Sequence, residues 1–501
     1  MSKPNVLLIT LDQLWAGALT GALGAAGSTP NLDRLASSSA VFRNHYSVTV
    51  PCGPARASLL TGLYAMNHRA IRNGTPLASH HATLATEARK SGFEPLLFGY
   101  CDVPADPTTR DPEDPDLSIY EGVAPGFREL VEMRMEEGLE WPAYLRAKGY
   151  DFTHSYKDGL PSHQRPISGA GRNKPRPSDP APYAAEHSDT AYLTDKTLEA
   201  LDIRRDTGWF AHLTYIRPHP PLIAPDPWNR LVGASDVTEP NRSRPGHPYL
   251  DAWFSGPSNR GLFWGFDGNC DGMATETAKE LRAVYLGLIA EVDHHLGRVI
   301  DWLERTGQDR DTLLILTSDH GEMLGEKGMW GKDSVFAPAY HVPLMIRDPR
   351  RPGGRAITAM TESVDVTPTI LDWIGRTVPE AMDGRSLLPL LEGSAPDDWR
   401  DWALMEADFG HPQTPSRIQR HLGFAPDDCG VMMLRSADWS YIHFAGDLPP
   451  MLFDLSTDPD ETVNLAQDPS HADQVAWCRG QLLDRTIRRR DRRLTEYSIG
   501  A

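Results

Sequence analysis

Two adjacent pairs of residues with metal-ligand chemistry stand far apart in this sequence. Asp12 and Gln13 follow the apolar run NVLLIT, and Asp319 and His320 follow the apolar run DTLLILT. Short apolar runs of this kind are typical of buried parallel strands. Because ligands bind beyond the carboxyl ends of such strands, we expect both pairs to meet at one edge of a sheet.

The four side chains together offer three oxygen donors and one imidazole. This set suits a hard-to-borderline divalent cation such as Mn²⁺, Ca²⁺ or Mg²⁺. Taken singly, Asp12 and Asp319 could equally be turn or helix-cap residues. The metal interpretation is favoured by a third segment of the chain.

That segment is CGPAR at 52–56, which continues to LTG at 60–62. Pro54 suits the first turn of a helix, so Cys52 is expected at the positive end of that helix, where anions are favoured. Arg56, one turn further on, could reach back to a nucleophile or a substrate. The alternative for Cys52 is a small buried thiol without a reactive role.

The motif C-x-P-x-R followed by T-G resembles the signature of the type I sulfatases of the alkaline phosphatase superfamily. Four further segments resemble sulfatase segments in the family's order, so the likeness covers essentially the whole chain: TPNLDRLA at 29–36, TSDHGE at 317–322, VDVTPTILDWIG at 364–375 and LFDLSTDPDETVNLA at 452–466. The resemblance implies an alkaline-phosphatase-like fold. It also implies a partner, a formylglycine-generating enzyme, that oxidises Cys52 to formylglycine.

The resemblance further implies a single divalent metal ion and a set of ligands at positions matching the family's motifs: Asp12, Gln13, Cys52 in its oxidised form, Asp319 and His320. In such a site a hydroxyl of the formylglycine hydrate attacks sulfur or phosphorus. The metal and Arg56 would lower the pKa of that hydroxyl. The second hydroxyl then loses its proton, and the ester is released by C–O cleavage.

Within the family, the segments at 44–70, 215–222 and 287–299 look most like phosphonate monoester hydrolases. Gln13 and His320 stand where many sulfatases carry Asp and Asn, and an imidazole ligand favours Mn²⁺ over Ca²⁺.

The same resemblance adds Asn73, His219 and Lys332 as residues that touch the substrate oxygens or the leaving group. Lys332 and His219 are candidate general acids or cationic clamps. Taken alone, His219 could be an ordinary loop histidine.

One departure from the family concerns Tyr100, Cys101 and Asp102. Common sulfatases have Lys-x-His here, and phosphonate monoester hydrolases have Tyr followed by Thr residues. Tyr100 is retained as a substrate-binding residue. We hypothesise that Asp102 takes the proton of the second hydroxyl, or orients the group that does. The alternative is a turn residue that points to solvent.

The predicted reaction is hydrolysis of sulfate monoesters, with phosphonate monoester or phosphodiester hydrolysis as the alternative native activity. All three are tetrahedral monoanions, so one site can turn over each of them, whereas dianionic phosphate monoesters should be poorer substrates. A two-metal phosphatase or mutase with a Ser or Thr nucleophile is disfavoured by Cys52. A non-catalytic binding protein is disfavoured because no ligand is lost.

Composition limits the partners further. The net charge of -18 argues against a nucleic-acid-binding surface, which would be basic. The 5 scattered cysteines do not indicate a disulfide framework. With neither a signal peptide nor a membrane span recognised, we expect a cytoplasmic enzyme that binds a small anionic ester and no membrane. We also expect a homo-oligomer, either a dimer or a tetramer.

Apolar runs alternating with amphipathic segments predict an α/β fold, a mainly parallel sheet with helices on both faces. We place this catalytic domain at 1–384, with loop insertions at 103–185 and 224–272. Residues 385–501 are predicted to form a small antiparallel subdomain with a closing helix.

The expected elements are given by range. Strands are predicted at 5–10, 94–100, 209–215, 311–317 and 342–346, and helices at 57–66, 189–201, 275–306 and 367–375. In the C-terminal part, short strands are predicted at 402–406, 430–435, 439–444 and 451–454, and the closing helix at 472–488.

Overall fold

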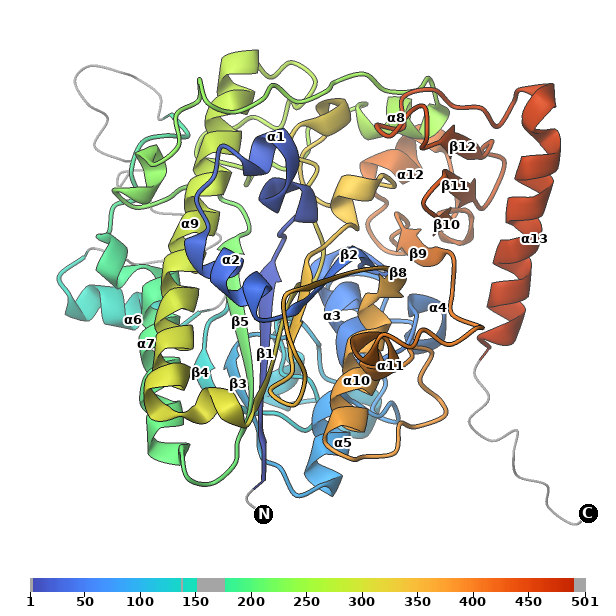
Figure 1. Cartoon of the computed structure of the whole chain (residues 1–501). Helices are drawn as coiled ribbons and strands as arrows, with labels where there is room; N and C mark the ends of the chain where they lie inside the picture. The colour runs from blue at the N-terminus through green and yellow to red at the C-terminus, as the bar shows by residue number, and fades with distance from the viewer. Residues whose placement is uncertain (1–2, 137, 151–175, 491–501) are drawn as a thin grey trace, which may run out of the picture.

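The computed structural model describes residues 3–136, 138–150 and 176–490. Its larger sheet has 8 strands in a mixed but mainly parallel arrangement (Figure 1). In spatial order these are β4 (Arg128–Glu132), β3 (Pro95–Gly99), β5 (Phe210–Pro218), β1 (Asn5–Asp12), β6 (Thr312–Ser318), β7 (Leu344–Arg347), β2 (Ala40–Tyr46) and β8 (Arg355–Glu362).

Strand β1 lies inside the sheet, hydrogen-bonded in parallel to β5 on one side and to β6 on the other. Every residue of these three strands is buried, which explains the apolar runs in β1 and β6. Strand β7 is the exception to the parallel arrangement, because it runs antiparallel to both β6 and β2. The carboxyl ends of β1 and β6 therefore lie side by side.

Alternate side chains of β1 point into two separate cores. Leu7 and Ile9 belong to one hydrophobic cluster, and Val6 and Leu8 belong to another. Helices α2 (Pro30–Ser37), α7 (Asp189–Arg204) and α9 (Thr275–Thr306) pack over the first core, and α3 (Cys52–Thr61), α5 (Leu84–Lys90) and α10 (Val366–Trp373) pack over the second (Figure 1). The predicted sheet with helices on both faces is confirmed.

The C-terminal part forms a separate 4-stranded antiparallel sheet in the order β12-β11-β10-β9. Its strands are β9 (Ala403–Asp408), β10 (Gly430–Arg435), β11 (Trp439–Phe444) and β12 (Met451–Asp454). Helix α13 (Ala472–Arg488) closes one face, where Val475 and Leu482 pack against Leu434 and Leu452. The small antiparallel unit was thus predicted correctly, while the domain boundary at 384/385 stays a prediction. Residues 491–501 lie outside the described residues.

Several local predictions were incomplete. The presumed loop at 103–185 contains β4 and α6 (Glu140–Ala147), and residues 151–175 of it lie outside the described residues. The presumed loop at 224–272 contains the short helix α8 (Pro248–Trp253). Strands β2 and β8 were not predicted. No helix among the described residues has the length and apolar character needed to cross a bilayer.

The helix predicted at 57–66 begins at Cys52 and is divided in two. Helix α3 ends at Thr61 because Gly62 adopts the left-handed conformation (φ 67°) that stops a helix. A short second helix, α4 (Ala65–His68), follows. Cys52 is the first residue of α3, at the positive end of the helix, where the position of Pro54 predicted it.

Candidate active site

The ends of β1, β6 and α3 bring four potential metal ligands together. Asp12 ends β1, Asp319 and His320 follow β6, and Cys52 is the first residue of α3. Their ligand atoms all lie within 4.8 Å of one another, and all four residues are buried. Nε2 of His320 lies 3.2 Å from Sγ of Cys52. The structure thus unites side chains from opposite ends of the chain, as the sequence predicted; their roles as ligands stay predictions.

An unsatisfied carboxylate oxygen tests whether this cluster fits a cation. Oδ1 of Asp12 is buried and has no hydrogen-bond partner among the described residues. It lies 3.9 Å from Nε2 of His320. A buried, unpaired carboxylate oxygen is costly, and a cation would remove that cost. The carboxylates of Asp12 and Asp319 and the imidazole of His320 fit a divalent ion such as Mn²⁺.

Gln13 lies beside this cluster, on a left-handed backbone (φ 67°). Its main-chain N–H donates to Oδ1 of Asp319 at 3.1 Å, and its Oε1 accepts from Nζ of Lys332 at 2.8 Å. Its side-chain Nε2 donates to the Glu322 carboxylate. These contacts direct Oε1 towards the site, which fits the predicted role of Gln13.

Glu322 is a supporting residue that the sequence analysis missed. It is fully buried and accepts from the main-chain N–H groups of Leu324 and Gly331 at 3.0 and 2.6 Å. Burial raises the pKa of its carboxyl. The signal was present in the segment TSDHGE, but an acidic residue there cannot be told from a surface residue without the fold.

Arg56 is surrounded by protein acceptors. Its Nε donates to Oδ2 of Asp319 at 2.9 Å, and its Nη2 donates to Oδ2 of Asp12 at 3.1 Å. Its Nη1 donates to the carbonyl of Tyr100 and to Oγ1 of Thr214, at 2.9 and 2.8 Å. The guanidinium is therefore engaged with protein partners, and no described contact joins it to Cys52. Its bonds orient the carboxylates of Asp12 and Asp319, while its predicted contact with the nucleophile or the substrate stays a prediction.

The charges in the cluster compensate one another. Burial alone would raise the pKa of Asp12, but Arg56, Lys332 and His320 lower it below its usual value. Burial and the charge of Asp12 raise the pKa of the Cys52 thiol well above its ordinary value. The carboxylate is thus kept ionised, while an unmodified thiol here is held in its less nucleophilic, neutral form.

The start of α3 is held by its neighbours. The main-chain N–H of Gly53 donates to Oδ1 of Asn73 at 2.9 Å. A Cβ atom at position 53 would lie 3.0 Å from the carbonyl oxygen of Asp102 and 3.1 Å from Oδ1 of Asn73, so this approach favours glycine. Asn73 therefore lies beside Gly53, the residue after Cys52, while its contact with a substrate oxygen stays a prediction.

Lys332 and His219 form a polar pair at the site. Nζ of Lys332 lies 2.8 Å from Nε2 of His219, and Nδ1 of His219 lies 2.5 Å from the carbonyl of Pro220. Burial and the Lys332 charge lower the pKa of His219 well below its ordinary value. Burial would also lower the pKa of Lys332, but the nearby carboxylates of Asp12 and Asp319 raise it. These contacts are those of a Lys332 ammonium group that donates a hydrogen bond to a neutral His219 imidazole.

Tyr100 and Asp102 are both buried. The Tyr100 hydroxyl donates to Oδ2 of Asp12, and its ring lies 4.0 Å below the Arg56 guanidinium. Tyr100 thus contacts a predicted ligand rather than an open surface. Asp102 is only 4 % exposed, and its Oδ1 has no partner among the described residues. This burial excludes the alternative of a solvent-facing turn residue, and it raises the pKa of Asp102 well above its usual range.

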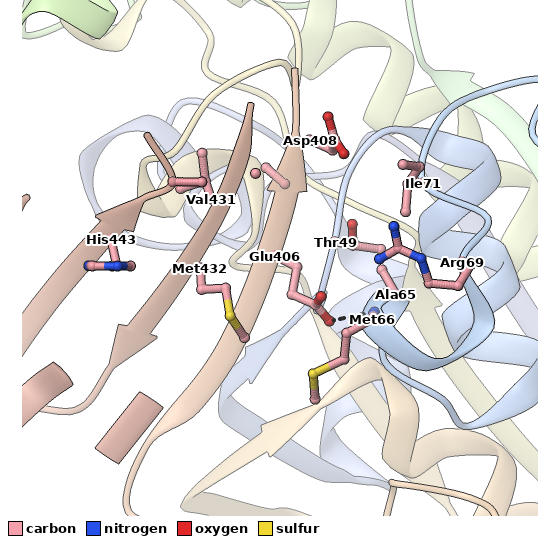
Figure 2. Close-up of a pocket in the computed structure, with 13 residues that line it drawn as sticks. Thr49, Ala65, Met66, Arg69, Ile71, Glu406, Asp408, Val431, Met432 and His443 are labelled. Atoms are coloured by element: carbon pink, nitrogen blue, oxygen red, sulfur yellow. Dashed lines mark hydrogen bonds between the residues drawn. The ribbon is translucent and has the colours of Figure 1, made fainter. Parts of the chain in front are cut away.

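A cavity of about 320 Å³ lies elsewhere, between α4 and the antiparallel sheet (Figure 2). None of the predicted site residues lines it. Figure 2 shows Glu406 pointing to α4, where its carboxylate accepts from the N–H of Met66 at 3.3 Å. Glu406 therefore has a structural role at the start of α4, and the chemistry stays with the cluster at β1, β6 and α3.

Comparison with known proteins agrees with this geometry. Residues 4–376 match the sulfatase family, and residues 325–488 match the family described as N-sulphoglucosamine sulphohydrolase, C-terminal. The chain belongs to the sulfatase family, which is part of the alkaline phosphatase superfamily.

Its relatives include well-matched proteins of full length. The multifunctional alkaline phosphatase superfamily protein PehA of Trinickia caryophylli is 38% identical over 99% of this chain and 98% of its own. The phosphonate monoester hydrolase SpPMH of Silicibacter pomeroyi is 46% identical, with a TM-score of 0.93 over 99% of this chain and 98% of that chain. The phosphonate monoester hydrolase of Agrobacterium radiobacter is 38% identical, with a TM-score of 0.91 over 98% and 97%.

Proposed function

We propose that this protein hydrolyses phosphonate monoesters and phosphodiesters, with sulfate monoesters as a second class of substrate. The observation that carries the proposal is the cluster of Asp12, Asp319 and His320 against position 52 at the N-terminus of α3. A cation site and a helix N-terminus together favour an oxyanion at this position. The sequence alone placed sulfate esters first.

The order of substrates rests on the relatives. The two structures with TM-scores above 0.9 are titled phosphonate monoester hydrolases. The imidazole of His320 and the uncharged amide of Gln13 also favour Mn²⁺ over Ca²⁺ in our proposal. Sulfate esters are retained as the second candidate because the family match over residues 4–376 is to sulfatases.

The nucleophile in this proposal is residue 52 after oxidation to formylglycine by a separate maturation enzyme. A formylglycine hydrate supplies one hydroxyl for attack and a second whose deprotonation releases the product by C–O cleavage. Sγ of Cys52 stands in for one of these oxygens in the structure.

The metal site would be formed by Asp12, Gln13, Asp319 and His320 together with residue 52. A bound divalent cation supplies Lewis-acid stabilisation of the substrate's negative charge. Arg56 holds the carboxylates of Asp12 and Asp319 in place from behind, through its bonds of 3.1 and 2.9 Å. This second layer fixes the orientation of both carboxylates before substrate binds.

Lys332 and His219 are proposed to protonate the leaving-group oxygen. The Lys332 ammonium is the proton donor of this pair, and Nε2 of His219, 2.8 Å away, accepts from it and orients it. Asp102 is proposed to accept the proton of the second hydroxyl, because its buried Oδ1 has no described partner. Asn73, beside Gly53, is proposed to contact a substrate oxygen.

A comparison of kcat/KM on aryl esters with one shared leaving group tests this function. Matured, Mn²⁺-loaded enzyme is assayed on an aryl phosphonate, an aryl phosphodiester, an aryl sulfate and an aryl phosphate monoester. We expect the phosphonate and diester to be the best substrates, the sulfate to be turned over, and the phosphate monoester to be poorest. A preference for the phosphate monoester would contradict the monoanion argument.

A further inference from the structure

A buried arginine supports the loop that carries His219. Arg217 lies near the end of β5 and is 2 % exposed. Its Nη1 donates to the carbonyl oxygen of His219 at 3.1 Å and to that of Pro221 at 2.8 Å. The turn that follows β5 is therefore bonded to the Arg217 guanidinium on both sides of Pro220.

The other edge of the same guanidinium is bound to the helical layer. Its Nε lies 3.2 Å from Oδ2 of Asp189, at the start of α7, and its Nη2 donates to the hydroxyl of Tyr183 at 3.3 Å. Glu291 of α9 is a second buried acidic group near Arg217; burial raises its pKa to about 8, although the Arg217 charge opposes this rise. Arg217 thus links the loop to two elements, α7 and the segment containing Tyr183.

A buried ion pair by itself is weak evidence for stability, because desolvation offsets much of the attraction. The two bonds to loop carbonyls have a more specific consequence. These two bonds fix the main chain of His219. Its side chain is hydrogen-bonded through Nδ1 to the Pro220 carbonyl and through Nε2 to Lys332. A shift of about 1 Å in such a group can reduce turnover by on the order of a hundredfold.

We propose that Arg217 is a positioning residue for leaving-group departure: through the carbonyls of His219 and Pro221, it holds the imidazole against Lys332. The proposal rests on the proposed role of His219 and Lys332 in protonating the leaving group. Arg217 is not part of the metal cluster and is not one of the predicted metal ligands.

The test uses phenyl and 4-nitrophenyl esters of the same phosphonate. Phenolate needs a proton to leave, whereas 4-nitrophenolate leaves readily without one. Arg217→Lys, His219→Ala and the double variant are compared with wild type as matured, metal-loaded enzymes. Arg400→Lys is the matched control, because Arg400 is also a buried arginine bonded to a carboxylate, that of Asp365, but has no described contact to the His219 loop.

We expect Arg217→Lys to lower kcat on the phenyl ester by about tenfold or more and on the nitrophenyl ester by much less. KM and metal content should stay near wild type. The double variant should lose no more than His219→Ala alone. Arg400→Lys should show no dependence on the leaving group.

Equal losses of Arg217→Lys on both esters, or a loss that adds to that of His219→Ala, would overturn the positioning role and leave the proposed function intact. If His219→Ala itself showed no dependence on the leaving group, the acid role of the pair would fail together with this inference. Should Arg217→Lys fail to fold, Asp189→Asn removes the charge that pairs with Arg217. It is expected to show the same dependence of kcat on the leaving group, with a smaller loss.

Discussion

Nε2 of His320 lies 3.2 Å from Sγ of Cys52, although 268 positions separate them in the chain. The contact exists because β1 and β6 are neighbours and because α3 begins where those strands end. Any group built on residue 52 therefore faces the imidazole and the carboxylates of Asp12 and Asp319. The following predictions depend on this arrangement.

Cys52→Ser should abolish turnover while leaving the fold and the metal ligands from β1 and β6 in place. A serine cannot be oxidised to formylglycine by chemistry that acts on a thiol. Mass spectrometry of the wild-type peptide should show loss of sulfur and gain of oxygen at residue 52. Cys478→Ser is the control, since this buried cysteine of α13 lies outside the cluster; it should keep full activity. Activity in Cys52→Ser would contradict the nucleophile assignment.

Arg56→Gln should destabilise the metal-free protein by about 3–5 kcal/mol, because it leaves two buried carboxylates without their counter-ion. Saturating Mn²⁺ should recover part of this loss by neutralising Asp12 and Asp319. The midpoint of thermal unfolding with and without metal measures both effects.

Arg34→Gln is a matched control for Arg56. Arg34 also pairs with two carboxylates, those of Asp301 and Glu304, but its side chain is 39% exposed. An exposed pair contributes at most about 1 kcal/mol, so this variant should unfold almost as wild type does, with or without metal. An equally small effect for Arg56→Gln would show that the guanidinium does not compensate the carboxylates.

Asp102→Asn should slow product release and accumulate a covalent adduct on residue 52. The amide cannot accept the proton that the carboxylate is proposed to take. Turnover should fall by about 10²–10⁴, in the range of a lost general base, and intact-mass analysis after rapid quenching should detect the adduct. Asp106→Asn, at a half-buried position on the same segment, serves as control. Unchanged turnover without an adduct in Asp102→Asn would remove the proposed role.

The buried carboxyl of Asp383 should make the stability of the protein depend on pH. Burial raises the pKa of Asp383 to about 6, against 3.8 for the ordinary side chain. The folded state therefore holds its proton to higher pH than the unfolded state does, and this stabilisation is lost as pH rises from about 4 to about 6. Between about pH 4 and 6, the free energy of unfolding of Asp383→Asn should therefore rise relative to that of wild type, by on the order of 3 kcal/mol.

Unfolding of wild type and Asp383→Asn at a series of pH values measures that gain. Asp484→Asn, at an exposed position of α13, should follow the wild-type curve throughout. A constant difference between wild type and Asp383→Asn across pH 4 to 7 would refute the raised pKa.

The parts of the fold that could be predicted are those in which a local pattern decides the structure. Helix α9 was predicted at its observed bounds because its apolar positions keep a helical period over 32 residues. Strands β1 and β6 were predicted because burial on both faces makes their central residues continuously apolar. In contrast, β4 (RELVE) is a charged edge strand, and no pattern distinguishes it from a loop.

The candidate site divides in a similar way. The pairs at 12–13 and 319–320 could be found because each directly follows an apolar strand. The contacts of Arg56 could not be predicted from the sequence, since they depend on the register of β1 beside β6. Glu322 and Arg217 were missed for the same reason, because both act through main-chain groups whose positions only the folded loops define.

The most direct test of the account is the binding of Mn²⁺ to metal-free enzyme, measured by equilibrium dialysis with elemental analysis. Wild type should bind a single ion per chain, and Asp12→Asn and His320→Ala should each weaken binding by on the order of a hundredfold. His212→Asn, at a buried histidine of β5 outside the cluster, should bind as wild type does. Wild-type affinity in Asp12→Asn and His320→Ala, or no binding by wild type, would contradict the claim that these residues form the metal centre.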